Sequence, residues 1–79
     1  MRLKLTINCI ALSLKELEGK EGRHYYQVSV DQDGEAGTLG ITEECYERIK
    51  PVFKKYQPAS LTCEYNDQYG NMRIINIKQ

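Results

Sequence analysis

Residues 42–56, TEECYERIKPVFKKY, are the place where the hydrophobic pattern of this chain changes its period. Thr42 is a typical N-cap residue, and two glutamates follow it in the first turn, where the helix dipole favours anions. Apolar residues then recur at helical spacing and form one stripe, made of Tyr46, Ile49, Phe53 and Tyr56. Pro51 lacks a backbone N–H and clashes with the preceding turn, so we expect the helix to break near Lys50. The segment predicts one short helix.

Three segments before this helix have the alternation of half-buried β-strands, at residues 2–12, 24–30 and about 35–41. The first has an apolar face that should point inward, made of Leu3, Leu5, Ile7 and Cys9. Its register blurs after Cys9, as it would at a bend or a bulge. Residues 15–23, KELEGKEGR, are charged and contain two glycines, which predicts an exposed loop.

Two more strands are expected after the helix, at residues 60–65 and 72–78, joined as a hairpin by a turn-rich connection. Five short strands with a helix between the third and the fourth can curl into a small barrel whose end the helix covers. The predicted fold is therefore mainly β with one helix, a single OB-like domain spanning residues 1–79. An SH3-like barrel and an open meander with one helix on its face have the same order of elements.

Composition excludes several classes of protein. The 79 residues include 11 basic and 11 acidic side chains, and no apolar run reaches the roughly 18 residues of a membrane span. The alternating first residues do not resemble a signal peptide. Three widely spaced cysteines without a CxxC pair, and a single histidine, predict reduced thiols in a cytoplasmic protein with no metal site and no cofactor. No nucleophile motif or phosphate-binding loop is present, so we expect no enzymatic activity and no catalytic residues.

The charges are segregated along the chain. Residues 31–47 contain six acids and no base, which leaves eleven bases against five acids elsewhere. A neutral total therefore does not exclude a polyanionic partner, because binding depends on the local potential.

Two tyrosines fall outside the predicted core. Tyr25 lies on the polar face of the second strand, and Tyr69 lies at the tip of the last hairpin. Exposed rings beside cations are typical of proteins that bind single strands, since bases stack on the rings while the cations follow the phosphates. The predicted nucleic-acid-binding residues are Lys4, Lys20, Arg23, Tyr25, Tyr69 and Arg73.

Two short segments resemble the single-stranded-DNA-binding proteins of filamentous phages. Residues 22–25, GRHY, are similar to the Gly-Lys-Pro-Tyr segment of that family, and residues 68–74, QYGNMRI, to its Gln-Phe-Gly-Ser-Leu-Met-Ile hairpin. The resemblance implies an OB-like dimer that binds single strands cooperatively, with Tyr25 and Tyr69 at the DNA-contacting positions and Arg23 where the family has lysine. The chain departs from the family in its longer predicted helix and its neutral net charge.

These observations favour a non-enzymatic protein that binds single-stranded nucleic acid, with DNA preferred over RNA, as a replication or transfer accessory of a phage or mobile element. A homodimer without membrane association is expected. The alternative is a protein-interaction module that uses an exposed strand edge or hairpin. Binding of a carbohydrate or another small ligand also remains open.

Overall fold

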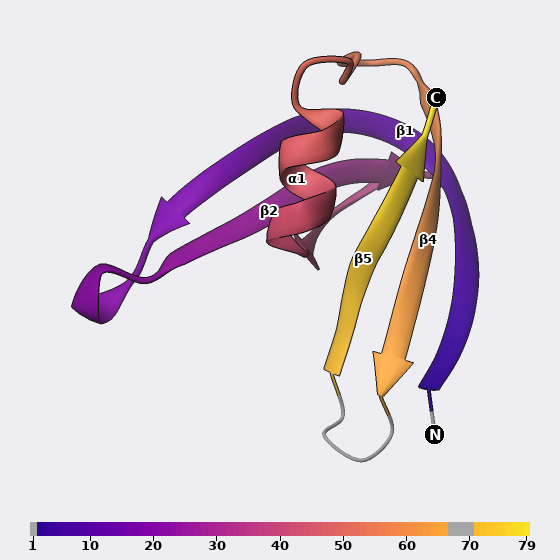
Figure 1. The fold of residues 1–79 in the computed structure, drawn as a ribbon. Coiled ribbons are helices and arrows are strands. Elements are labelled where there is room, and N and C mark those ends of the chain that lie inside the picture. Colours follow the sequence, from indigo (N-terminus) through magenta and orange to yellow (C-terminus); the bar gives the residue numbers. More distant parts are fainter. Residues whose placement is uncertain (1, 67–70) are drawn as a thin grey trace.

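The computed structural model describes residues 2–66 and 71–79, and in it five strands form one closed sheet in the order β1-β2-β3-β5-β4 (Figure 1). The strands are β1 (Arg2–Glu18), β2 (His24–Gln32), β3 (Glu35–Ile41), β4 (Pro58–Asn66) and β5 (Asn71–Lys78). A 3₁₀ turn, η1 (Lys20–Gly22), follows β1, and the helix α1 (Glu43–Ile49) follows β3. The predicted mainly β chain, with its helix between the third and fourth strands, is confirmed. Neither helix in the described ranges is long and apolar enough to cross a membrane.

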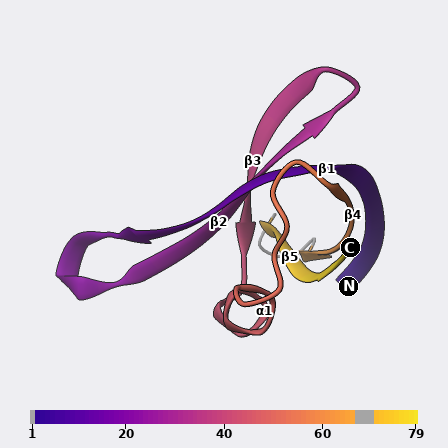
Figure 2. The same ribbon diagram turned by 90° about the horizontal axis from the view of Figure 1, so that it is seen from above.

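β1 is a single long strand that belongs to both halves of the sheet. Residues 2–10 pair antiparallel with β4, and residues 10–18 pair antiparallel with β2. The register with β2 shifts between Ala11 and Ser13, which confirms the expected irregularity after Cys9. β1 curves around the molecule as a result (Figures 1 and 2). The exposed loop predicted for residues 15–23 is wrong over its first part, because residues 15–18 continue β1 and pair with β2.

The sheet closes at a single point. β3 runs parallel to β5 and meets it only at Ile41 and Ile74, while residues 60–66 of β4 pair with β5. Seen from above, the β2–β3 hairpin projects away from the β1, β4 and β5 strands on the far side of this junction (Figure 2). The β2–β3 pair and the β4–β5 pair therefore diverge on either side of the Ile41–Ile74 pair.

α1 begins and ends where the sequence predicts. The Thr42 hydroxyl accepts the backbone N–H of Cys45 at 3.3 Å, and the helix stops at Ile49, with Lys50 as its C-cap, directly before Pro51. Arg48 anchors the helix to β5 by donating to the carbonyl oxygen of Ile75 at 3.0 Å.

The apolar stripe predicted from helical spacing faces the core only within the helix itself. Tyr46 and Ile49 are buried, and the Tyr46 ring packs 4.5 Å from the Tyr26 ring. Phe53 is half-buried against the core, but Tyr56, expected in the core, is 72% exposed. Helical spacing no longer fixes direction once the helix has ended, and Tyr56 instead lies in the left-handed region with φ of 63°.

The core fills the inside of the closed sheet and extends under α1. Its largest fully buried side chains are Val28, Cys45, Leu61, Cys63 and Ile74. Leu3 and Leu5 have the predicted alternation but are 45% and 52% exposed, so the expectation that they are buried is wrong. β2 pairs with β1 only from Ile10 onward. The core-facing side of residues 2–9 therefore extends beyond the interior of the closed sheet.

Candidate nucleic-acid interface

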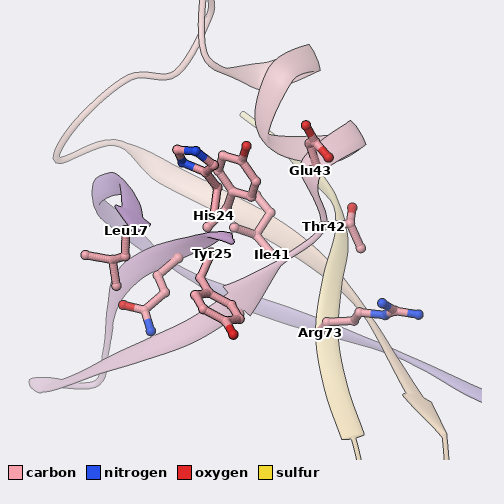
Figure 3. A pocket seen from close by; sticks show the side chains of 10 residues that line it. Leu17, His24, Tyr25, Ile41, Thr42, Glu43 and Arg73 are labelled. Atoms are coloured by element: carbon pink, nitrogen blue, oxygen red, sulfur yellow. The ribbon is translucent and has the colours of Figure 1, made fainter. Parts of the chain in front are cut away.

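A groove of about 450 Å³ lies where the first residues of β2 and the last residues of β3 meet the start of α1 and of β5 (Figure 3). Tyr25, Gln27 and Gly40 line one side of it, and Arg73 of β5 lines the other. The groove follows from the single-point closure of the sheet, because β3 and β5 separate directly beside Ile41.

Tyr25 is the exposed aromatic residue of this groove. It lies opposite Leu17 in the β1–β2 ladder, and the two side chains are 52% and 41% exposed. The Cε2 edge of its ring lies against Gly19, where a Cβ atom would lie 3.0 Å from Cδ2 of Tyr25 and would overlap Cε2. Leu17 and Gly19 thus support the ring at its edge while leaving about half of the residue accessible.

Arg73 shares the groove with Tyr25 but its side chain points away from the ring (Figure 3). In the ladder it lies opposite Glu64, which lies opposite Lys4. These three side chains form one row across the outer face of β5, β4 and β1, and Arg2 joins it with its Nε 3.9 Å from a Glu64 oxygen. Lys4 and Arg73 are therefore two strand spacings apart, about 10 Å.

Lys20 and Arg23 lie at the other end of the groove region, in the connection between β1 and β2. Both are exposed, and the backbone N–H of Arg23 bonds to the Lys20 carbonyl at 3.4 Å. Between them, Glu21 and Gly22 adopt φ of 63° and 73°, which makes a tight turn that projects beyond the sheet (Figure 1). The predicted cations thus form two separate groups, Lys20 and Arg23 in the connection before β2, and Arg73 and Lys4 on the outer face of β5 and β1, and of these Arg73 lines the groove.

Tyr69, the second predicted stacking residue, lies outside the described residues.

The side of the groove next to α1 is acidic. Glu43 lines it, and the Nδ1 of His24 lies 3.2 Å from an Oε1 of Glu16. Partial burial raises the pKa of Tyr26, and the nearby carboxylates of Glu43, Glu16 and Glu47 raise it further. A polyanion would be repelled from this side and directed toward Tyr25.

The sequence did not predict Leu17, Gln27, Gly40 or Glu43 as parts of the groove. Leu17 could have been found, because Lys15 and Leu17 alternate with Glu16 and Glu18 as in a strand. Glu43 could not, because its position depends on how α1 packs beside the sheet.

Metal-ligating and nucleophilic groups do not gather elsewhere in residues 2–66 and 71–79, where no group of three or more His, Cys, Asp or Glu side chains could hold a metal ion. The three thiols, of Cys9, Cys45 and Cys63, are free and buried. Burial raises the pKa of each of them, which makes them poor nucleophiles.

The chain matches no protein-family model, no curated protein and no solved structure.

Proposed function

We propose that this chain is a non-enzymatic OB-like barrel that binds single-stranded nucleic acid in the groove beside Tyr25. The exposed Tyr25 ring carries the proposal. The edge of the ring lies against Gly19, the residue is 52% exposed, and it lines a groove that opens at the junction of β3 and β5. A ring held in this way offers a face to any base and loses little freedom on binding.

The charge distribution supports a path for the strand. Lys20 and Arg23 lie in the connection that leads into β2 directly before Tyr25, and Arg73 lines the same groove as Tyr25 at one end of the row that it forms with Glu64 and Lys4, so both groups could neutralise phosphates of a strand stacked on Tyr25. Glu43 also lines the groove, so phosphates would be repelled from the part of the groove next to α1. Few phosphates would be engaged, so binding should be modest and sensitive to salt.

The wider role that we propose is that of a cytoplasmic accessory in the replication or transfer of a phage or mobile element, with DNA as the preferred ligand. It rests on the resemblance of residues 22–25 and 68–74 to the phage proteins.

The test is fluorescence anisotropy with a labelled oligo-dT at low salt. Tyr25→Ala should weaken binding about 5- to 150-fold, the equivalent of about 1–3 kcal/mol for one stacked base, whereas Tyr25→Phe should bind nearly as well. Tyr56→Ala is the matched control, because Tyr56 is 72% exposed and lies outside the groove. Equal affinities for wild type and Tyr25→Ala, or no saturable binding by the wild type, would contradict the proposal.

The salt dependence gives a second readout. The logarithm of the affinity should fall linearly with the logarithm of salt concentration, by about 0.7 per neutralised phosphate. Arg73→Gln should make that slope shallower if Arg73 contacts a phosphate. An unchanged slope would show that Arg73 does not contact a phosphate of the bound strand.

A protein-interaction module is the second candidate, and one observation favours it. The described registers pair residues 2–9 of β1 with β4 alone, which leaves an open strand edge. A partner strand added there would protect from hydrogen exchange the alternate amides of residues 2–9 that point away from β4, and would leave Tyr25 unaffected.

A further inference from the structure

A second groove, of about 400 Å³, lies next to the Tyr25 groove, between the first turn of α1 and β5. Thr42, Glu43 and Arg73 line both grooves, so the two meet at these residues. Arg73 points away from the Tyr25 ring (Figure 3) and is also part of the wall of the second groove. The second groove adds one cation that the Tyr25 groove lacks, the exposed Arg48 of α1.

A bulge in β5 fixes the position of Arg48. The register between β4 and β5 shifts by one residue, and Ile75 is the extra residue of β5 at that step. Nη2 of Arg48 donates to the carbonyl oxygen of Ile75 at 3.0 Å and to Oδ1 of Asn76 at 3.1 Å. Ile75 lies two residues beyond Arg73, which is about 7 Å along a strand. The Arg48 guanidinium is thus held beside β5, one short step from Arg73.

Both arginines have donors left for an anion. An arginine side chain has five N–H donors, and the bonds of Arg48 to Ile75 and Asn76 use two of them. Arg48 and Arg73 are both exposed, and no carboxylate of residues 2–66 and 71–79 forms an ion pair with either. The pair therefore offers two positive charges that no acid of the described chain neutralises by direct contact.

The acids of the second groove belong to a different element from the site of these charges. Glu43 and Glu44 lie in the first turn of α1, whereas Arg48 is bonded to β5 and Arg73 is part of it. A phosphate would be repelled from the first turn of α1 and attracted to β5. The groove therefore favours an anion that lies along β5.

We infer that the strand stacked on Tyr25 continues into the second groove, where Arg73 and Arg48 bind its phosphates. The inference rests on the proposed function and names the route that the strand takes beyond Arg73. Guanidinium groups suit this task, because their planar fork can donate two parallel bonds to one phosphate. Arg48 is already held in place by β5, so it loses little side-chain freedom on binding.

The other route beyond Arg73 crosses the sheet toward Lys4. Glu64 lies between Arg73 and Lys4 in the ladder, so a strand on that route would pass over a carboxylate. On the route toward Arg48, Ile75 and Asn76 follow Arg73 in β5, and both are uncharged. Repulsion by Glu64 therefore favours the route toward Arg48.

Fluorescence anisotropy with labelled oligo-dT at several salt concentrations tests the route. Arg48→Gln should make the slope of log affinity against log salt shallower by about 0.7, the share of one phosphate. Arg48→Lys keeps the charge and should keep the slope close to that of the wild type. Lys55→Gln is the matched control, because Lys55 is exposed and lines neither groove, and it should leave the slope unchanged.

Arg48→Gln also removes two hydrogen bonds to β5, so a measurement on the wild type accompanies it. In two-dimensional NMR of the full chain, oligo-dT should shift the Nε–Hε resonances of both Arg48 and Arg73. A shift for Arg73 without one for Arg48 would overturn the inference, whether or not the variant is stable.

The outcomes separate this inference from the proposed function. A slope that Lys4→Gln makes shallower and Arg48→Gln leaves unchanged would overturn the inference and show the route across the sheet. If Tyr25→Ala still weakens binding in that case, the proposed function stands without the second groove. A wild type without saturable binding of oligo-dT would overturn both.

Discussion

Replacement of Gly19 by alanine tests how the Tyr25 ring is held. The added Cβ would lie 3.0 Å from Cδ2 of Tyr25 and would overlap Cε2, whereas carbon atoms in contact are normally about 3.5–4.0 Å apart. The ring must therefore move by about 1 Å, and it is free to do so because Tyr25 is 52% exposed. The backbone itself accepts alanine, since Gly19 is extended with φ of −96° and ψ of −166°.

The cost to folding should be small. Alanine in place of glycine stabilises by about 0.4–1 kcal/mol through the unfolded chain, while forcing the ring off its preferred rotamer costs about 0.5–1.5 kcal/mol. The two effects nearly cancel, so the free energy of unfolding should change by less than about 1 kcal/mol. Binding should respond more strongly, because a displaced ring forfeits up to about 1–3 kcal/mol of stacking per base.

Two-dimensional NMR measures the displacement directly. In the wild type, the ring current of Tyr25 should shift the Gly19 Hα that points at the ring edge downfield, and Gly19→Ala should move the Tyr25 ring resonances. Gly37→Ala is the matched control, because no atom lies within 4 Å of a Cβ at Gly37. The reasoning is refuted if the Tyr25 ring resonances are the same in the wild type and Gly19→Ala, or if Tyr25→Ala leaves the Gly19 Hα shifts unchanged.

Three further predictions concern stability, measured by urea unfolding. Leu61→Ala should cost about 2–5 kcal/mol because Leu61 is completely buried, and Leu3→Ala should cost clearly less; equal costs would contradict the burial pattern. Thr42→Ala removes the helix cap and should cost about 0.5–2 kcal/mol, whereas Thr42→Ser should cost little. Burial raises the pKa of the three thiols in the folded state, so their contribution to stability should be constant below their ordinary pKa of about 8.5 and be lost at higher pH. A urea midpoint that does not fall by about pH 10 would disagree.

Periodicity predicted most of the fold because each element buries one face. Alternation located the strands, and the change of period at Thr42 together with Pro51 located both ends of α1. The last residues of β1 were missed because Lys15–Glu18 combine strand alternation with charges on both faces, next to two glycines. The local composition is typical of a loop, but these residues form a strand because they pair with β2.

Alternation indicates which side of a strand a residue faces but not what lies opposite. The alternation therefore assigns Leu3 and Leu5 to the core, although β2, the strand that would cover them, pairs with β1 only from Ile10 onward. The same limit applies to the groove. Tyr25 was identifiable as exposed from its place on the polar face, but the direction of Arg73 and the approach of Glu43 depend on where β3 meets β5.

The double role of β1 has a consequence for the order in which the chain folds. Its second half pairs with β2, which follows after a short connection. Its first half pairs with β4, whose residues 58–66 lie some fifty positions further along the chain and are synthesised much later. During synthesis, residues 2–9 remain without their partner until most of the protein has left the ribosome. Arg2 and Lys4 alternate with the leucines there, and such charges hinder the mispairing of waiting strands in neighbouring nascent chains.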